Sequence, residues 1–94
     1  MDPEFEWDAE KAKRNRAKHR VTFEEAATVF GDPFARICDD PTHSEQEDRF
    51  LILGESARRR LLLVSFTERG DKLRIISARL ASRQERKRYE ELQD

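Results

Sequence analysis

The residues of this sequence that are best suited to chemistry are cationic and gather at two places. Lys18 and His19 end a basic segment near the N-terminus, and Arg74 and Arg79 interrupt an apolar stretch with the composition of a β-strand. Glu68 stands just before that stretch. A histidine or a carboxylate can move a proton, while lysine and arginine bind phosphate oxygens. Together these residue types indicate cleavage of a phosphodiester bond.

Cleavage of RNA without a metal ion needs three kinds of group. A base takes the proton of the ribose 2′-hydroxyl, cations stabilise the charge that develops on the phosphate, and an acid protonates the leaving oxygen. His19 or Glu68 can be the base, and Lys18, Arg74 and Arg79 can hold the phosphate. We therefore expect these residues to form the catalytic set. Further cations are expected to bind RNA: Lys11, Arg14, Arg69, Arg83, Arg86 and Lys87.

These residues also have a purely structural interpretation, which the sequence leaves open. Arg74 can be a solvated or paired arginine at a sheet edge, and Arg79 can be a strand-end residue that faces the following helix. His19 can simply complement the negative end of a helix dipole. Catalysis requires a fold that brings these side chains together.

Other kinds of chemistry have weaker signals. His43 lies in an acidic run, but the run lacks the turn glycine and ligand spacing of a calcium loop and has no second His or Cys for zinc. The glycines are scattered, so no nucleotide-binding loop is expected. Cys38, the only cysteine, lies in an apolar strand pattern and is expected to be a small buried side chain. We expect no metal and no cofactor.

Size and composition limit the class of protein. The chain has 94 residues, of which 41% are charged, yet its formal charge is only −1. A single domain over residues 1–94 is expected at this length, and residues 1–4 resemble a remnant of a cloning vector. The apolar runs are far shorter than the ~20 residues that span a membrane, and no export signal is visible. With one cysteine, these features favour a cytoplasmic protein.

The near-zero net charge is a sum over segments of opposite sign. Residues 11–20 hold six basic and no acidic residues, residues 21–48 hold eight acidic and one basic, and residues 49–94 hold twelve basic and seven acidic. Such a pattern can present a polyanion-binding surface in one place and an acidic surface in another.

Two helices are expected in the first third of the chain, after a short strand at 5–7. Asp8 has the side chain of an N-cap for a helix that runs to about His19. Thr22-x-x-Glu25 has the spacing of a capping box and starts a second helix, which ends at Gly31-Asp32-Pro33. The packing side of the first helix is expected to carry Ala9, Ala12, Arg16 and His19.

Four strands and a final helix follow. Strands are expected at 34–38, 49–54, 60–67 and 72–79, with an acidic loop at 39–48 and a tight turn at 68–71. Leu61–Val64 is apolar on both faces, so this strand should be central and covered on both sides. Ser82-x-x-Glu85 starts a helix whose inner side carries Glu85, Tyr89 and Leu92. The expected class is α+β, a single domain with a small antiparallel sheet, two N-terminal helices and one C-terminal helix.

Taken in order along the chain, these motifs resemble those of the BrnT toxin family. The resemblance covers residues 5–91 and rests on a set of short pieces: Phe5-Glu6-Trp7-Asp8, Lys11, Asn15, Lys18-His19, Val21-Thr22-Phe23-Glu24-Glu25-Ala26, Val29-Phe30-Gly31-Asp32-Pro33, Gly54-x-Ser56, Val64-Ser65-Phe66-Thr67-Glu68-Arg69, Arg74-Ile75-Ile76-Ser77-Ala78-Arg79 and Arg86-x-x-Tyr89-Glu90. It implies a RelE-like fold and a metal-independent endoribonuclease that stops translation and arrests growth.

The same resemblance implies partners. Toxins of this family are neutralised by a BrnA antitoxin that carries a ribbon-helix-helix DNA-binding domain, so a hetero-oligomer with a dimeric antitoxin is expected. RNA would be the substrate, and DNA would be contacted only through the antitoxin.

Two positions depart from the family pattern. Arg20 stands where the family commonly has glycine after the Lys-His pair, so the turn must be made differently or the arginine must tolerate an unusual backbone. The segment 55–60 also lacks a glycine that is often found there, which leaves the length of that hairpin open.

A non-catalytic module that only binds nucleic acid or an acidic partner is the rival interpretation. Salt-sensitive RNA binding without products would favour it. A regulator that binds DNA directly has less support, because no helix-turn-helix is recognisable in the sequence.

Overall fold

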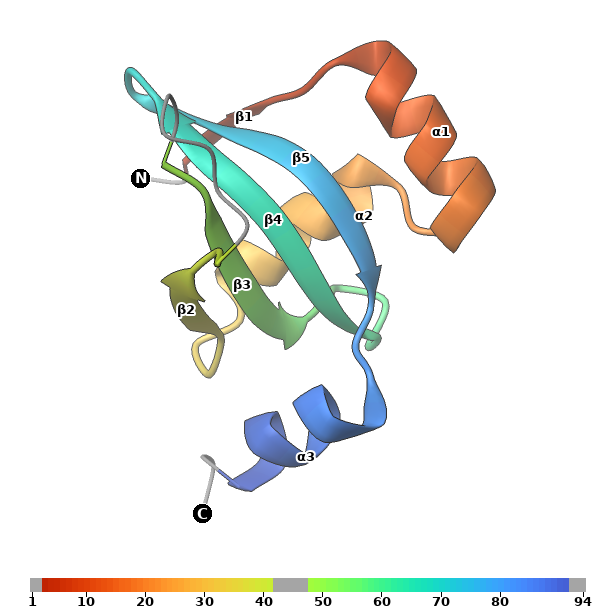
Figure 1. Ribbon diagram of the computed structural model, residues 1–94, viewed down its shortest axis with the longest axis vertical. Helices are drawn as coiled ribbons and strands as arrows, with labels where there is room; N and C mark the ends of the chain where they lie inside the picture. Colours follow the sequence, from red (N-terminus) through yellow and green to blue (C-terminus); the bar gives the residue numbers. More distant parts are fainter. Residues whose placement is uncertain (1–2, 42–47, 92–94) are drawn as a thin grey trace.

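The computed structural model describes residues 3–41 and 48–91 (Figure 1). The elements follow the expected order: β1 (Glu4–Glu6), α1 (Ala9–His19), α2 (Phe23–Thr28), a 3₁₀ turn η1 (Val29–Gly31), β2 (Arg36–Asp39), β3 (Phe50–Glu55), β4 (Leu61–Arg69), β5 (Lys72–Leu80) and α3 (Arg83–Glu91). The α+β class is confirmed. No described helix is long and apolar enough to cross a membrane.

The strands form one sheet in the order β1-β5-β4-β3-β2 (Figure 1). The pairs from β2 to β5 are antiparallel, as expected, whereas β1 adds a parallel pair in which Phe5 lies opposite Leu73. β4 is the central strand, and Leu62 and Val64, which face the helices, are both 0% exposed. On its other face Leu61 is buried but Leu63 is partly exposed. The predicted central position is confirmed, whereas the cover on the second face is only partial.

The two faces of the sheet are covered unequally. α1, α2 and η1 pack against one face and enclose the main core, built from Val21, Phe23, Ala26, Val29, Ile52, Leu62, Val64, Phe66, Ile75 and Ala78. On the other face α3 covers one end, where Tyr89 packs with Leu53 and Leu61. Ser65 and Thr67 are also buried on this face, where they donate to the Asp40 carboxylate and the Asp48 carbonyl. This second face, which also carries the partly exposed Leu51, Leu63, Arg74 and Arg79, is called the open face below.

The packing side of α1 follows the expectation only in part. Ala12 packs against the main core and His19 is half-buried, whereas Ala9 and Arg16 are exposed and the buried residue is Asn15. Asn15 Nδ2 donates to the carbonyls of Val21 and Ala78, both at 2.9 Å, and Asn15 Oδ1 accepts from the Ala78 N–H at 3.1 Å. The side-chain amide of Asn15 bonds to the edge of β5 at Ala78, past the end of the β1–β5 pairing, and occupies the position that a neighbouring strand would have there. A buried polar contact therefore docks this helix, because an amide can satisfy backbone groups that an alanine would leave unpaired.

Both departures from the family pattern are accommodated by arginines in the left-handed conformation. Arg20 has φ 58° and caps α1 by donating its N–H to the Arg16 carbonyl at 2.9 Å. Arg59 has φ 62° in the hairpin between β3 and β4, which Ser56 and Arg60 close with an N–H···O bond of 2.8 Å. A left-handed residue with a Cβ costs roughly 1 kcal/mol relative to ordinary backbone.

The expectation that Cys38 is buried is wrong. β2 is an edge strand that pairs with β3 alone, and all four of its residues are exposed. Cys38 is exposed with them, and its neighbour Ile37 is 61% exposed. The apolar pattern of this segment was therefore typical of a strand but not of a buried one.

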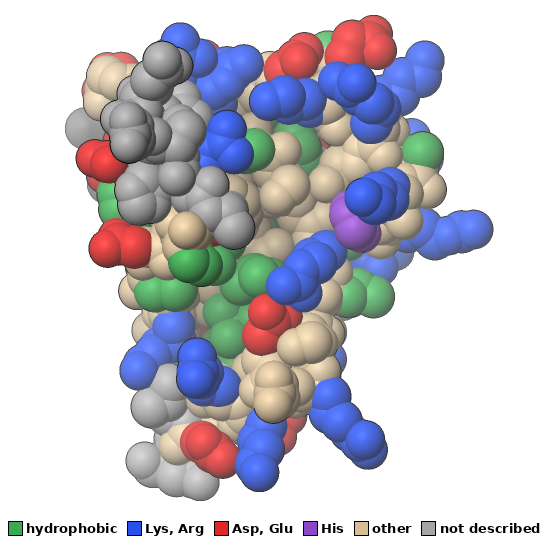
Figure 2. Space-filling view, in the orientation of Figure 1, with side chains coloured by type: hydrophobic (Ala, Val, Ile, Leu, Met, Phe, Trp, Pro, Cys, Tyr) green, Lys and Arg blue, Asp and Glu red, His purple; other side chains and the backbone are tan. Residues whose placement is uncertain are grey.

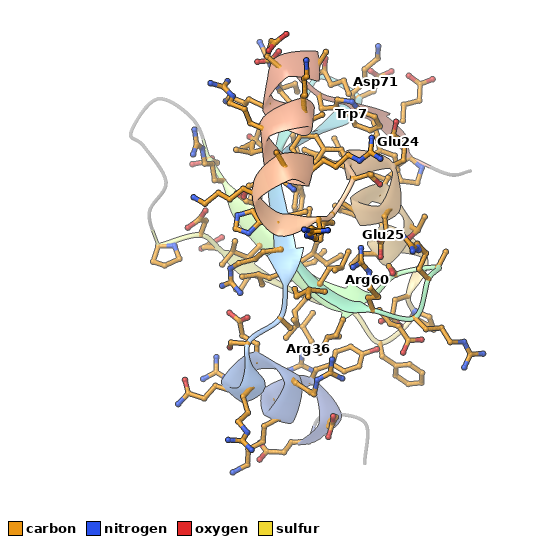
Figure 3. The ribbon with its side chains drawn as sticks, turned by 90° about the vertical axis from the view of Figure 1, so that its right-hand side faces the viewer. Trp7, Glu24, Glu25, Arg36, Arg60 and Asp71 are labelled. Carbon is orange, nitrogen blue, oxygen red and sulfur yellow. The ribbon has the colours of Figure 1, made fainter. Side chains whose placement is uncertain are left out.

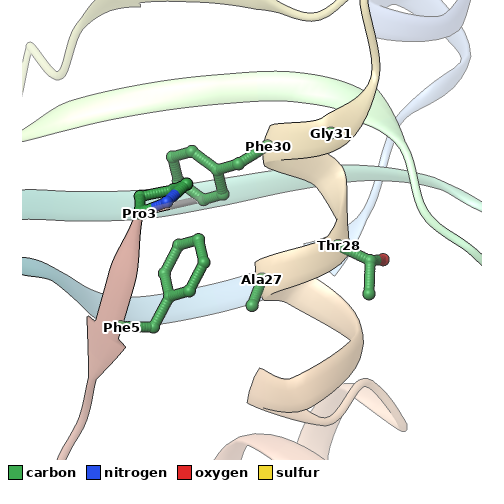
Figure 4. A pocket seen from close by; sticks show the side chains of 6 residues that line it. All are labelled: Pro3, Phe5, Ala27, Thr28, Phe30 and Gly31. Atoms are coloured by element: carbon green, nitrogen blue, oxygen red, sulfur yellow. The ribbon is translucent and has the colours of Figure 1, made fainter. Parts of the chain in front are cut away.

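Aromatic side chains close the core next to β1. The rings of Phe5 and Phe30 have centroids 5.1 Å apart, and those of Phe30 and Phe66 lie 4.9 Å apart. Beside them is a shallow hollow of about 340 Å³ between β1 and α2 (Figure 4). Its lining comprises Pro3, Phe5, Ala27, Thr28, Phe30 and Gly31. None of these side chains can take or give a proton, so the hollow contributes no acid or base.

Candidate functional site

A β-bulge in β5 determines which cations share a face. Leu63 pairs with Arg79 and Thr67 pairs with Arg74, but between these pairs β5 holds one residue more than β4, at Ile76. Residues five apart in a regular strand point to opposite faces. The extra residue shifts the alternation by one, as bulges do. Arg74 and Arg79 therefore both lie on the open face.

Arg79 is held by the first turn of α3. Its guanidinium donates to both carboxylate oxygens of Glu85, at 2.8 and 3.0 Å, and to the Leu80 carbonyl at 3.2 Å. The hydrogen bond from Arg79 lowers the pKa of Glu85 and outweighs the opposite effect of burial. Glu85 also completes the expected capping box, accepting from the Ser82 N–H at 2.7 Å. Two of the five guanidinium N–H groups have no acceptor among the described residues, so Arg79 retains donors for a phosphate.

Arg74 lies at the other end of the open face. Glu6 of β1 stands opposite it in the parallel pair, and the two charged groups are 3.4 Å apart. Both side chains are only partly exposed, at 27% and 33%. Because of the bulge, Arg74 and Arg79 are four pair positions apart, from Thr67 to Leu63 of β4, or roughly 13 Å along the strand. They can therefore contact different phosphates of one RNA strand but not a single phosphate.

Glu68 does not join these arginines. It is exposed and pairs with Leu73, whose side chain packs against the main core on the helical face of the sheet. Because side chains alternate along β4, Glu68 lies on the face opposite that of Arg74. Of the two bases that the sequence offered, only His19 is left near Arg79.

The C-terminal end of α1 brings Lys18 and His19 to the edge of β5. Asn15 is bonded to Ala78, the neighbour of Arg79. His19 is one helical turn further on the same side of α1, so it lies close to the β5 edge, and it is half-buried. Lys18 is exposed beside it.

The cations predicted to bind RNA surround the open face rather than line it. All six are exposed. Lys11 and Arg14 lie on α1, and Arg69 ends β4. Arg83, Arg86 and Lys87 lie on α3. They can supply a positive field around the molecule.

The open face is hollowed between the sheet and α3 (Figure 2). The hollow measures about 270 Å³ and is lined by Arg36, Ile37, Cys38, Leu51, Leu53, Leu63, Glu85, Arg88 and Tyr89. Its floor is apolar and its rim carries charge, a combination that suits stacking of a base above a held phosphate. Within residues 3–41 and 48–91, no three His, Cys, Asp or Glu side chains are grouped to hold a metal ion.

A second ion pair fixes the turn after His19. Glu25 of α2 is buried; it accepts from Ser56 Oγ at 2.7 Å and from both Nε and a terminal nitrogen of Arg60 (Figure 3). The hydrogen bond from Arg60 lowers the pKa of Glu25, against the effect of burial. Arg60 also donates to the Arg20 carbonyl at 3.0 Å. This network ties the end of α1 to the β3–β4 hairpin and so helps to position Lys18 and His19.

Residues 7–85 match the family model described as "Ribonuclease toxin, BrnT, of type II toxin-antitoxin system". The chain belongs to the BrnT family. The crystal structure of the Brucella abortus ribonuclease toxin BrnT is similar, with a TM-score of 0.63 and 26% sequence identity over 86% of this chain and 99% of that chain. No functionally curated protein matches the chain. Membership in a BrnT family of type II toxins implies an RNA substrate and an antitoxin partner.

The sequence reading of this BrnT-family site missed three features. The sequence places Asn15 between the packing and solvent sides of the first helix and does not predict its burial, although a polar residue beside small ones can indicate a buried contact. It predicts Glu85 on the inner side of the last helix and allows Arg79 to face that helix, but not the ion pair between them. The bulge at Ile76 has no local sequence signal, since it depends on the pairing of two strands.

Proposed function

We propose that this chain is a metal-independent endoribonuclease toxin that cleaves RNA on the open face of its sheet. One observation carries the proposal: the bulge places Arg74 and Arg79 on the same face, and Asn15 holds the helix of His19 against the strand of Arg79. This arrangement supports a site in which His19 transfers a proton and the arginines bind phosphate, since cleavage of a phosphodiester needs both kinds of group held by rigid elements.

In the proposed reaction the ribose 2′-oxygen of the substrate attacks the adjacent phosphorus. His19 takes the 2′-hydroxyl proton as the base, and the bond from phosphorus to the 5′-oxygen breaks. The leaving 5′-oxygen receives a proton, and the products are a 2′,3′-cyclic phosphate and a 5′-hydroxyl end. Arg79 and Lys18 stabilise the charge that develops on the phosphate oxygens, and Arg74 holds a more distant phosphate.

The carboxylate of Glu85 has a defined part in this scheme. In the free protein it holds the Arg79 guanidinium in place. A substrate phosphate can use the remaining N–H groups of Arg79 or displace the carboxylate, since the pair is partly exposed and its replacement by another anion conserves charge. Glu85 is thus a positioning residue, and Arg79 is the catalytic one.

We further propose the cellular consequence and the partner. Cleavage of RNA inhibits translation in the cytoplasm and arrests growth. A BrnA-type ribbon-helix-helix antitoxin, dimeric in the complex, neutralises the toxin, and DNA is contacted through the antitoxin alone. The family supports these statements at the level of a type II toxin with an antitoxin partner.

The test is RNA cleavage by the purified chain in excess EDTA. Because the proposed base and phosphate ligand act in the transition state, we expect His19→Ala and Arg79→Ala to lower kcat by about 10²-fold or more. Glu68→Gln, on the opposite face, should keep wild-type activity. Expression of the wild-type chain, but not of His19→Ala, should stop growth.

The matched control is Glu85→Gln, which removes the ion pair but leaves Arg79. If Arg79 served only to anchor α3, Glu85→Gln would lose as much activity as Arg79→Ala, and the catalytic assignment would be wrong. RNA that binds in a salt-sensitive way but gives no product with the wild-type chain would instead support a binding module. Cleavage that EDTA abolishes would contradict metal independence.

A further inference from the structure

A second cationic surface lies on the helical side of the molecule, away from the open face. It is a hollow of about 590 Å³ beside the C-terminal half of α1, lined by Lys13, Arg16, Ala17, Arg20, Thr22 and Arg58. Four of the six lining residues are cations, and none of them belongs to the RNA-binding set predicted from the sequence. This surface is called the α1 hollow below.

The cations from α1 form a row on one side of the helix. Lys13, Arg16 and Arg20 follow one another at spacings of three and four residues, so their side chains neighbour each other along about 10 Å of helix. Like charges at these spacings repel each other. The helix dipole favours Arg16 in the last turn of α1 and Arg20 at the C-cap, but Lys13 lies before that turn, so the dipole does not account for the whole row.

The carboxylate that pairs with Arg58 in the α1 hollow is bound mainly by other groups. Glu25 is 5% exposed and is bound by Ser56 and Arg60, whose hydrogen bonds occupy its oxygens. Arg58 is 3.8 Å from that carboxylate, yet its side chain is 71% exposed. The guanidinium of Arg58 thus remains available to an anion in solvent.

The backbone of Arg20 gives an independent indication. Its φ of 58° lies in the left-handed region, where glycine is favoured over any residue with a Cβ. Arg20 keeps its long cationic side chain at this position and directs it into the lining of the α1 hollow. The cap of α1 explains the left-handed backbone itself, so the indication lies in the retained arginine side chain, because glycine would make the same cap with less strain.

The lining also indicates the kind of ligand. Ala17 is its only apolar side chain, whereas protein segments that dock in grooves anchor themselves with buried apolar residues. Guanidinium and ammonium groups with little apolar surface match the phosphates of a nucleic acid backbone. Arg20 directly follows His19, so an RNA strand that reaches the open face can continue around the end of α1.

We propose that the α1 hollow is an additional RNA-binding subsite, which holds backbone phosphates of the substrate outside the cleaved linkage. This inference rests on the proposed ribonuclease function for its substrate class. The subsite contributes affinity for long RNA and leaves the chemical step unchanged. It predicts a requirement for substrate length that the open face alone would not impose.

The first experiment uses the triple variant Lys13→Ala/Arg16→Ala/Arg58→Ala, none of whose residues takes part in the proposed chemistry. With a 20-nucleotide RNA we expect KM to rise about tenfold at unchanged kcat, whereas kcat/KM for a hexanucleotide should stay at the wild-type value. Unchanged KM for the long RNA would overturn the proposal, and so would an equal loss on both substrates.

A binding experiment separates the subsite from catalysis. The ligand is a 2′-O-methyl RNA of 20 nucleotides, which cannot be cleaved through its 2′-oxygen. The slope of log Kd against log salt should be smaller by about 2 in the triple variant, because each of the three lost phosphate contacts contributes roughly 0.7 to this slope. If the wild-type chain cleaves no RNA but shows this change, the proposed function fails and the subsite stands. If a polyglutamate peptide loses affinity and RNA does not, the hollow binds protein and the subsite is refuted.

Arg20→Gly tests the argument from the backbone. Glycine relieves the left-handed strain, so the thermal midpoint should stay the same or rise while the KM for long RNA increases.

Lys72→Ala is the matched control for Lys13→Ala. It also removes an exposed lysine, but at the β4–β5 turn, whereas Arg58 of the α1 hollow lies in the β3–β4 hairpin at the opposite end of β4. If Lys72→Ala raises KM as much as Lys13→Ala, general charge and not the hollow accounts for the affinity.

Discussion

Two glutamates occupy the same position of a capping box and do different things. Glu85 closes its box with Ser82 and pairs with Arg79 on the open face, where the two side chains are 26% and 42% exposed. Glu25 accepts no bond from the Thr22 backbone in its box; its side chain, 3% exposed, turns to Ser56 and Arg60. Thr22 still caps the helix by accepting from the Glu25 N–H at 3.0 Å.

The difference separates a structural pair from a functional one. A buried carboxylate with all its partners in place cannot exchange them for a ligand without leaving charges unpaired in a poorly solvated site. A partly exposed pair gains little stability and can be exchanged for a phosphate at small cost. The Glu25–Arg60 pair therefore belongs to the scaffold, and the Glu85–Arg79 pair has the exposure that the proposed site requires.

Breaking the buried pair should have the largest effect on stability. Glu25→Gln leaves Arg60 without its anion and weakens the bond to Ser56, and we expect a loss of about 3 kcal/mol in the free energy of unfolding. Urea denaturation followed by circular dichroism measures it. A loss under about 1 kcal/mol would place this pair in the same class as the exposed one.

Breaking the exposed pair should have a smaller effect. In Glu85→Gln the amide oxygen can still accept from the Ser82 N–H, so only the charge interaction with Arg79 is lost. We expect a decrease of about 0.5–1 kcal/mol in the same denaturation experiment. A decrease as large as that of Glu25→Gln would show that exposure does not distinguish the two pairs.

Acid should weaken both pairs, and the buried one more. The pKa values of Glu25 and Glu85 are lowered below the ordinary 4.5, in each case chiefly by the hydrogen bond from an arginine. Their contribution is therefore complete above the unfolded value and is lost as the pH falls through the lower folded values. Stability should be level down to about pH 5 and decline below pH 4.5. Glu25→Gln should flatten this decline more than Glu85→Gln, as thermal midpoints across the acid range can determine.

Of these tests, ionic strength should give the smallest difference in stability between the two pairs. Raising ionic strength screens the exposed Arg79–Glu85 pair, so the stability difference between wild type and Glu85→Gln should shrink by a few tenths of a kcal/mol. The difference between wild type and Glu25→Gln should change less, because screening hardly reaches a buried pair. Equal salt sensitivity of the two differences would argue against the contrast in burial.

The fold was largely predictable from local patterns. Apolar alternation gave the strands to within about two residues at each end, and Asp8, Thr22 and Ser82 act as the N-terminal caps that their positions indicate. These features depend on residues within a few positions of each other. Leu92 and His43, for which the sequence also gave expectations, lie outside the described residues.

The site was predictable in its residue types but not in its arrangement. Ser56 and Arg60 lie 31 and 35 positions from Glu25, so nothing near Glu25 shows that its carboxylate leaves the capping box. Asn15 reaches a strand 63 positions away, and neither its burial nor its role as a dock for α1 has a local signal beyond its polarity. Such contacts follow from the tertiary fold and override local preference.

The bulge at Ile76 has a consequence for how this sequence can change. Deletion of Ile76 would leave Arg74 and Arg79 four positions apart, opposite Thr67 and Leu63, so regular pairing would keep both arginines on the open face. One additional residue in β4 opposite Ile76 would also make the pairing regular, but the two arginines would then be five positions apart in a strand without a bulge and would point to opposite faces. The shared face of the two arginines therefore tolerates the loss of a residue from β5 at this point but not the gain of one in β4.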